Sequence, residues 1–309
     1  MKIGLIDVDG HNFPNLPLMK LAAYHRRRGD EVEFWQPLFR YDVVYKSKVF
    51  TFTPDMAYMP MADAIYYGGT GYKPPGLLER QRDKEIQHAY ISELPPEVER
   101  ITPDYSLYPQ YSEAYGFLTR GCPRNCSFCI VTQKEGCASK RVADLREFWT
   151  GQKTIKLLDP NLLACMERER VLKQLADSGA WVDFTQGLDI RLIDKDVIEL
   201  LNRVKVKIHH FAWDNPAEDL TPQFTFFAEH TNIKDHRRRG VYVLTNFTST
   251  HAEDLARVYT LRDLGFDPYV MIFDKETAPQ ETRYLQRWVN NKRIFKTVRT
   301  FKEYDNKRG

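Results

Sequence analysis

Apolar runs alternate with a helical stretch along the first hundred residues. Hydrophobic side chains recur at helical spacing in residues 18–28 and stop before Gly29, a residue type that often follows the end of a helix. Strands separated by a helix and by Gly-rich turns favour a small, open, largely parallel sheet. The pattern therefore predicts a Rossmann-like N-terminal domain over residues 1–104. Its expected strands are the apolar runs at residues 2–8, 31–35, 42–52 and 62–67.

A more regular pattern follows residues 94–109, where four prolines predict an extended linker. Six repeats of an apolar run and a stretch with helical spacing predict an α/β fold, namely a partial (β/α)6 TIM-like barrel over residues 105–309. The Lys- and Arg-rich residues 291–309 are expected to form a mobile tail or a final strand and cap. The expected strands are residues 115–119, 154–158, 181–185, 206–213, 240–246 and 268–273, and the clearest helices are 168–175, 196–204, 252–264 and 282–290.

Polar residues stand where the strands of the second pattern end. In parallel βα folds the working groups lie at the carboxyl ends of the strands, so we expect the functional site at that edge. The residues that end or follow the six strands are Arg120, Asp159, Gln186, Asp214, Asn246 and Asp274.

The composition narrows the class of protein only slightly. The chain is 42% hydrophobic and 28% charged, an ordinary globular balance, and its net charge of +3 neither indicates nor excludes a nucleic-acid partner. No apolar stretch approaches the ~18 residues of a membrane span, and acidic residues appear too early for a secretory signal. We therefore expect a cytoplasmic protein. Five cysteines, three of them within eight positions, point to metal binding or redox chemistry rather than to disulfides.

Cys122, Cys126 and Cys129 lie in one predicted loop directly after the first strand of the second pattern. Three thiolates can each bind a different iron of a cubane and leave the fourth iron open, whereas a zinc site or an electron-transfer cluster normally has a fourth protein ligand. Arg120 and Arg124 can offset the negative charge of the thiolates. The remaining interpretation is that these are buried structural cysteines or a zinc knuckle.

The CysxxxCysxxCys spacing, with an aromatic residue before the last Cys, resembles the radical S-adenosylmethionine (SAM) superfamily. The run from Arg120 to Ile130 is similar to two of its branches, the tRNA methylthiotransferases and the members with a cobalamin-binding-like N-terminal domain. The Rossmann-like half and the lead-in at residues 104–109 look more like the second branch. The resemblance implies a [4Fe–4S] cluster whose open iron binds SAM. It also implies an electron donor such as flavodoxin or ferredoxin, reductive cleavage of SAM, and hydrogen abstraction from a substrate in a site closed to oxygen.

The resemblance also implies contacts to SAM. The backbone of Phe128 would lie near the adenine, unless this ring is only a core aromatic. Asp159 or Asn161 would bind the SAM ammonium in place of the Gly-Gly-Glu of the family, or Asp159 would simply cap a turn. Gln186 can reach the ribose hydroxyls. Arg191 suits the SAM carboxylate or an ion pair with Asp189. Weaker candidates are the residues 213–215 and Asn246, which are more often strand-end caps.

Other motifs carry weaker signals. Residues 9–14 resemble the Asp-x-His-x-x-Gly loop whose histidine ligates cobalamin, but Pro14 replaces the glycine, so cobalamin is an unfavoured cofactor. The Gly-rich residues 68–71 mark a tight turn more often than a phosphate loop. His209 and His210 lie on one strand and should face opposite ways. The remaining expectations are a solvated basic turn at residues 237–239, apolar packing of Cys165 and no assigned role for Cys137.

The sequence thus predicts a radical SAM enzyme that acts on an unidentified small molecule, peptide or nucleic acid. One alternative is an enzyme that modifies a tRNA or DNA base, which the cysteine loop and the basic C-terminal stretch suggest. An alternative of another class is a non-catalytic iron–sulfur or zinc protein that acts as a redox-sensitive binding module.

Overall fold

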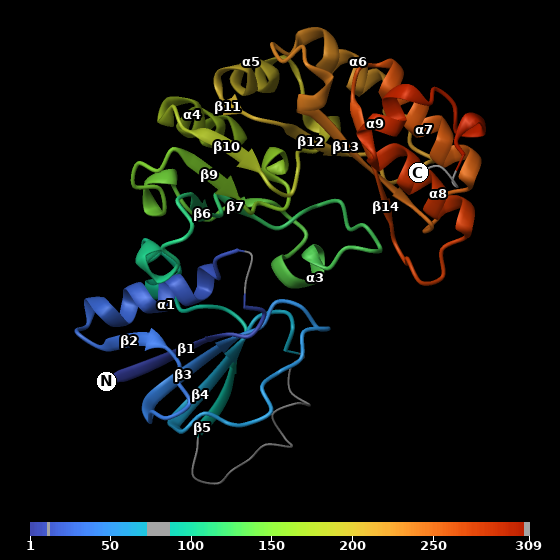
Figure 1. Cartoon of the computed structure of the whole chain (residues 1–309). Helices are drawn as coiled ribbons and strands as arrows, with labels where there is room; N and C mark the ends of the chain where they lie inside the picture. Colours follow the sequence, from blue (N-terminus) through green and yellow to red (C-terminus); the bar gives the residue numbers. More distant parts are fainter. Residues whose placement is uncertain (11–12, 73–86, 306–309) are drawn as a thin grey trace. The chain divides into compact units, whose positions relative to one another are not determined.

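The computed structural model describes residues 1–10, 13–72 and 87–305, apart from the side chain of His88. The chain divides into two compact units (Figure 1). The first comprises Met1–Ala114 and Arg146–Thr150, and the second comprises Tyr115–Leu145 and Gly151–Gly309. In the described parts of both units, no helix is long and apolar enough to cross a membrane.

The first unit contains a five-stranded sheet whose neighbouring strands are all parallel. Its order is β2-β1-β3-β4-β5, a flavodoxin-like order that changes direction between β1 and β3. The predicted α/β class is confirmed. Strand β5 was not predicted, because its few apolar residues do not alternate. The strands are β1 (Lys2–Asp7), β2 (Glu31–Phe34), β3 (Tyr41–Ser47), β4 (Ala62–Gly68) and β5 (Gln87–Ile91).

Helix α1 (Leu16–Arg27) covers this sheet in the first unit. The Asn15 side chain accepts a hydrogen bond from the Leu18 amide at 3.3 Å and begins the helix, and Leu18 packs with Ile3 of β1 in the core. The prediction of an extended linker at residues 94–109 was wrong. This segment forms α2 (Pro96–Glu99) and η1 (Tyr105–Leu107), because three of its apolar residues are buried in the same core; these are Val98, Leu107 and Tyr108.

Besides a short two-stranded pair, the described part of the second unit contains two larger sheets. One has the order β11-β10-β9-β6, the other β12-β13-β14, and the described strands form no closed barrel. The pairs β9–β10, β10–β11, β12–β13 and β13–β14 are all parallel, which agrees with the predicted α/β class, while the barrel itself stays a prediction. The strands are β6 (Ala114–Gly116), β9 (Thr154–Leu157), β10 (Trp181–Phe184), β11 (Lys205–Val206), β12 (His209–Ala212), β13 (Arg239–Thr245) and β14 (Asp267–Ile272).

The predicted strand at residues 206–213 is interrupted, and this interruption separates the two sheets. The Arg238 guanidinium donates to the carbonyl oxygens of Val206 at 2.5 Å and Lys207 at 2.8 Å. A guanidinium supplies several donors in one plane, so it satisfies backbone groups that a neighbouring strand would otherwise bind. The break between β11 and β12 therefore has a side-chain cause.

Helices follow most strands of the second unit. In Figure 1 α4, α5 and α6 lie on one side of the strands β9–β13, and α3 (Val131–Glu135) lies on the other. Helix α6 escaped sequence prediction because its aromatic and β-branched residues have modest helix propensity. In the stretch at residues 291–309, for which a tail or a final strand was predicted, the structure contains α9 and the short helix η6 (Phe301–Glu303), and residues 306–309 lie outside the described residues. The helices are α4 (Arg168–Ser178), α5 (Lys195–Arg203), α6 (Thr221–His230), α7 (His251–Asp263), α8 (Gln280–Asn290) and α9 (Lys292–Thr297).

An aromatic cluster fills the space between β12 and α6. His209 is 2% exposed and stacks on Phe211 at 6.2 Å, while His210 is half-buried and stacks on Tyr242 at 5.6 Å. The predicted opposite orientation of the two histidines is confirmed. The solvated turn predicted at residues 237–239 is wrong for Arg239, which is buried and donates to the Ile233 carbonyl oxygen at 2.8 Å.

Burial, together with the smaller effects of the charges of Arg238, His210 and Arg239, lowers the pKa of His209 to about 3. Its Nδ1 has no hydrogen-bond partner among the described residues. Between the ordinary value of 6.5 and about 3, the unfolded chain binds a proton that the folded chain does not. Stability is therefore lost as the pH falls through this window, by up to about 1.4 kcal/mol per pH unit.

We predict that His209→Phe reduces this loss. Urea unfolding at pH 7 and pH 5 should show a smaller drop in the free energy of unfolding for the variant than for the wild type. The control is Phe184→Leu, a change in a ring that stacks on the same imidazole at 6.4 Å. Relative to the wild type, Phe184→Leu should lower the free energy of unfolding by the same amount at pH 7 and at pH 5. If the free energy of unfolding of His209→Phe falls as much between pH 7 and pH 5 as that of the wild type, the prediction is wrong.

Candidate functional site

The three clustered cysteines lie in a loop closed by a short antiparallel pair. Strand β7 (Thr119–Arg120) pairs with β8 (Lys140–Arg141), and the loop between them carries α3. The amide of Cys122 donates to the Gly136 carbonyl oxygen at 3.2 Å, and the amide of Cys129 donates to the Cys126 carbonyl oxygen at 2.9 Å. The loop is thus ordered by its own backbone hydrogen bonds.

Gly121 is required at the start of this loop. Its φ is +88°, and a Cβ atom there would lie 2.2 Å from the Ala138 carbonyl oxygen. Only glycine fits such a left-handed conformation and so close a backbone approach. Asn125 also has a positive φ, +49°, which asparagine tolerates better than most residues.

The three thiols are free and half-buried. Burial raises the pKa of the Cys126 thiol. The Asp214 carboxylate and the thiols of Cys122 and Cys129 raise it further, whereas Arg191 lowers it. The three thiols, Asp214 and Arg191 therefore lie within electrostatic reach of one another. Throughout the described residues, no three His, Cys, Asp or Glu side chains are arranged to hold a single metal ion.

Asp159 anchors the strand that leads into the loop. Its carboxylate is buried and accepts hydrogen bonds from the amides of Leu118 and Thr119 and from the Thr119 hydroxyl at 2.7 Å. Burial raises the pKa of Asp159 to about 6, although these hydrogen bonds oppose the rise. The observed contacts give Asp159 a structural role in holding the strand before the cysteines, rather than the turn and helix cap that the sequence allowed.

Asn161 has a buried oxygen that lacks a donor. The residue is 5% exposed, and its Nδ2 lies 3.5 Å from Cys122 Sγ and 3.3 Å from Asp189 Oδ2. Its Oδ1 has no hydrogen-bond partner in the part of the chain that the structure describes. Buried polar atoms are nearly always satisfied, so an unfilled acceptor beside a thiol is suited to a ligand with an N–H group.

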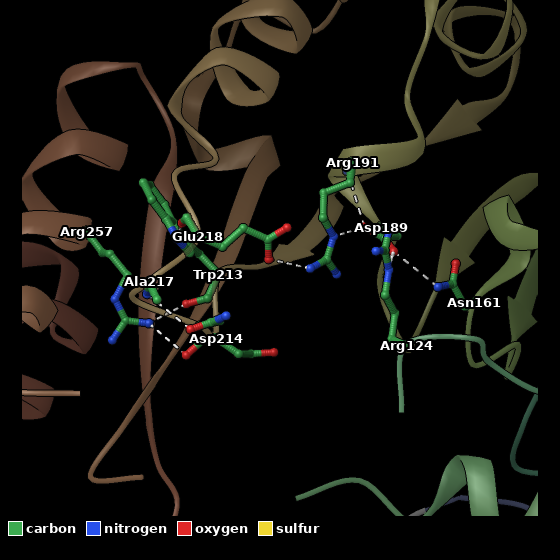
Figure 2. Close-up of polar contacts among 10 residues, drawn as sticks. Arg124, Asn161, Asp189, Arg191, Trp213, Asp214, Ala217, Glu218 and Arg257 are labelled. Atoms are coloured by element: carbon green, nitrogen blue, oxygen red, sulfur yellow. Dashed lines mark hydrogen bonds and ion pairs between the residues drawn. The ribbon is translucent and has the colours of Figure 1, made fainter. Parts of the chain in front are cut away.

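Asp189 is the centre of a buried ionic network (Figure 2). Its carboxylate binds Arg124 Nε and Arg191 Nε, each at 2.6 Å, in addition to Asn161. Burial alone would raise the pKa of Asp189, but the two guanidinium groups hold it below its ordinary value. Because Arg124 lies between Cys122 and Cys126, Asp189 ties the cysteine loop to the segments after β9 and β10.

The network continues to the segment after β12. Arg191 Nη1 binds Glu218 Oε2 at 2.7 Å, so the predicted alternative of an Arg191–Asp189 ion pair is confirmed and extended. Arg257 of α7 donates to the carbonyl oxygens of Trp213 at 2.6 Å and Asp214 at 3.2 Å. Burial raises the pKa of Asp214, which Arg257 and Arg191 oppose. The sequence pattern did not reveal Glu218 or Arg257, because neither stands at a strand end.

Phe128 begins a row of exposed aromatic rings, which we call the aromatic trio. Its ring is 37% exposed and lies 5.5 Å from the ring of Phe247, which lies 4.6 Å from that of Phe273. Phe247 and Phe273 follow β13 and β14, so the trio joins the cysteine loop to two strand ends. Phe128 is therefore not a core aromatic. Asn246 donates to the Asp274 carbonyl oxygen at 2.9 Å, as expected of a strand-end cap.

The remaining sequence candidates lie apart from this network. Gln186 is exposed in the turn after β10. Cys165 is buried, as expected for an apolar role, and Cys137 is exposed.

Two motifs of the first unit lack support for a ligand role. In the cobalamin-like motif, His11 and Asn12 lie outside the described residues. In the Gly-rich turn, a Cβ at Gly69 would lie 2.2 Å from the Lys48 carbonyl oxygen, so close backbone packing explains this glycine.

Comparison with known proteins gave weak matches over part of the chain. A tRNA-2-methylthio-N(6)-dimethylallyladenosine synthase of Bordetella avium is 26% identical over 137 residues, which are 42% of this chain and 28% of that protein. The protein of the same name from Bordetella pertussis is 29% identical over 140 residues, 42% of this chain and 29% of that protein. This chain is similar to tRNA methylthio synthases. It spans under a third of the length of these relatives.

No family model matches the chain. The relatives agree with one of the two branches that the cysteine loop resembles. The cobalamin-binding-like branch, which the sequence favoured, is not confirmed by these matches.

We predict that Gly121→Ala destabilises the cysteine loop. The methyl group would collide with the Ala138 carbonyl oxygen, so the loop must shift, and iron bound after anaerobic reconstitution should fall well below the wild-type level. The control is Gly136→Ala, which also has a positive φ, +92°, but whose added Cβ would meet nothing within 4 Å. That variant should lose about 1–3 kcal/mol from backbone strain, because a φ of +92° with a ψ of 168° is a conformation essentially restricted to glycine, but it should keep its iron. Equal iron contents in the two variants contradict the prediction.

Proposed function

We propose that this chain is a radical SAM enzyme whose [4Fe–4S] cluster is held by Cys122, Cys126 and Cys129. One observation carries the proposal: three free, half-buried thiols lie in one loop, and the Asn161 amide, whose Nδ2 lies 3.5 Å from Cys122 Sγ, has an unfilled buried oxygen. Thiolates are the ligands that iron–sulfur clusters use, and the side chains around the loop supply both hydrogen-bond donors and cationic groups. The similarity to tRNA methylthio synthases supports the same class.

When bound, such a cluster supplies the electron for reductive cleavage of SAM. The chain's own residues would hold the cofactor. Asn161 Oδ1 would accept a hydrogen bond from the SAM ammonium, and Arg191 would use its remaining Nη2 donors for the carboxylate, because Nε and Nη1 already bind Asp189 and Glu218. Gln186 would reach the ribose hydroxyls, and the Phe128 backbone would lie near the adenine.

Other parts of the chain would support this site. Asp159 would stay an anchor for the strand before the cysteines, since its oxygens already accept hydrogen bonds from the chain. Residues 1–104 would act as a separate domain from the cofactor-binding residues 105–309. A flavodoxin or ferredoxin would supply electrons.

A second candidate narrows the substrate to RNA. All three relatives are named as synthases of a modified adenosine in tRNA, and this favours a nucleic-acid base over a small molecule or peptide. The contrasting candidate is a non-catalytic iron–sulfur or zinc protein. Formation of 5′-deoxyadenosine from SAM under anaerobic reduction separates the two, because only an enzyme produces it.

We predict that Cys126→Ala removes both the cluster and the activity. Reconstituted wild type should bind about four irons per chain and form 5′-deoxyadenosine when reduced with SAM. Cys126→Ala should lose most of the iron and the visible chromophore and form no 5′-deoxyadenosine. The exposed Cys137 provides the control, since Cys137→Ala should behave as the wild type. If the wild type binds iron but does not cleave SAM, the radical SAM proposal is wrong and the non-catalytic candidate remains.

We predict that Asn161→Ala weakens SAM binding while the cluster remains. Loss of a hydrogen bond to a charged group costs about 1.5–3 kcal/mol, so the KM for SAM should rise roughly 10- to 150-fold. Iron content should stay near the wild-type value. Asn232→Ala is the control, because that amide binds only the Asn202 carbonyl oxygen, at 2.9 Å, in another loop. An unchanged KM with normal iron would remove Asn161 from the SAM site.

A further inference from the structure

A hollow on the second unit has a lining suited to a polyanion. Its volume is about 510 Å³, and it lies between α8 and the segment that follows β14. A second hollow of about 570 Å³ combines Arg170 and Lys173 with three acidic residues, Glu167, Glu169 and Asp177. The first hollow has three cationic residues in its lining and no carboxylate. The lining residues that matter are Lys275, Gln280, Arg283, Tyr284, Gln286 and Arg287.

The cationic groups of this basic hollow are ordered by the chain. Arg283 Nη2 donates to the carbonyl oxygens of Lys275 at 2.8 Å and Glu276 at 3.0 Å, which fixes the guanidinium and leaves its other donors for a ligand. Arg287 lies one turn later on α8, on the same face. Ordered guanidinium groups bind phosphate well, because their planar donors match its oxygens.

Acidic residues near the basic hollow are engaged elsewhere or lie outside its lining. Glu281 Oε1 lies 3.3 Å from His251 Nε2. Asp274 accepts hydrogen bonds from the Glu276 amide at 3.0 Å and the Thr277 hydroxyl at 2.7 Å. Glu276 is exposed but does not line the hollow. The lining itself thus has three cationic residues and no carboxylate.

The basic hollow adjoins the aromatic trio along the chain. Lys275 follows Phe273 by two residues. The ring of Phe273 contacts that of Phe247, which in turn contacts the ring of Phe128, the residue before Cys129. Exposed aromatic faces stack unpaired bases of single-stranded RNA, while neighbouring cations bind its phosphates. If the basic hollow bound the phosphates of an RNA, and Phe247 and Phe273 stacked one of its bases, that base would lie close to the cysteine loop.

We propose that the basic hollow binds the sugar–phosphate backbone of an RNA substrate, while Phe247 and Phe273 stack one of its unpaired bases. This inference rests on the proposed radical SAM function and gives its substrate class. It concerns RNA rather than a free nucleotide, since a base at the trio and phosphates in the hollow require several linked residues.

The test uses the reconstituted full-length chain and an unmodified tRNA transcript. The double variant Lys275→Glu, Arg287→Glu should bind the tRNA at least 10-fold more weakly near 100 mM salt. The slope of log affinity against log salt should shrink by about 0.7–0.9 for each lost phosphate contact. Lys173→Glu makes the same charge change in the second hollow and should leave both quantities unchanged. Phe273→Leu should weaken tRNA binding without changing the salt slope.

Three results would overturn the inference. One is an unchanged tRNA affinity in the double variant, checked to be folded by its circular dichroism and iron content. Another is a wild type that does not bind tRNA. The third is that the double variant loses as much affinity for duplex DNA of similar length as for tRNA, which would indicate a general polyanion surface.

Cleavage of SAM measured without RNA in the same samples separates this test from the proposed function. If the wild type forms 5′-deoxyadenosine normally but the substitutions leave tRNA binding unchanged, only the proposed RNA site is wrong. If the wild type forms no 5′-deoxyadenosine, the proposed radical SAM function is wrong, whatever the tRNA measurements show.

Discussion

The buried carboxylate of Asp189 is the interaction on which the candidate site depends. It receives hydrogen bonds from Arg124 in the cysteine loop, from Asn161 after β9 and from Arg191 after β10. Away from water such charge-assisted bonds are strong, but each also becomes costly to break, because an unpaired buried charge remains. Asp189 thus fixes the relative positions of three segments that no shared backbone ladder connects.

Backbone constraints act together with this carboxylate. Asp159 holds the strand before the cysteines through the amides of Leu118 and Thr119, and Gly121 lets the chain pass close to the Ala138 carbonyl oxygen. These contacts set the direction in which the loop leaves the sheet. The ionic network then has to position only the part of the loop around Arg124. The rigid entry and the ionic tether together explain how an irregular loop can hold three thiols within electrostatic reach of one another.

The sequence predicted the parts of this site that local pattern encodes. The spacing of the cysteines located the loop, and the family resemblance that it carries brought Asn161 and Arg191 to attention. Long-range pairing has no such signature, so the links from Asp189 to Arg124 and from Arg191 to Glu218 were visible only in three dimensions. The break between β11 and β12 was hidden for the same reason, since the Arg238 that causes it lies some 30 positions away in sequence. Apolar periodicity likewise failed for α6, where aromatic residues lowered helix propensity but packed in the core.

The Arg124 tether has a consequence for how the protein acquires metal. Zinc fingers fold only when their ion arrives, so ordering the chain consumes part of the binding free energy. Here the loop has internal hydrogen bonds and an ionic tether that do not involve the thiols at all. Much of the conformational entropy of the loop is therefore already lost in the apoprotein, at roughly 1–2 kcal/mol per residue fixed. Insertion of the proposed cluster would then be a local event in a folded chain, and a cluster damaged by oxygen could be rebuilt without unfolding the domain.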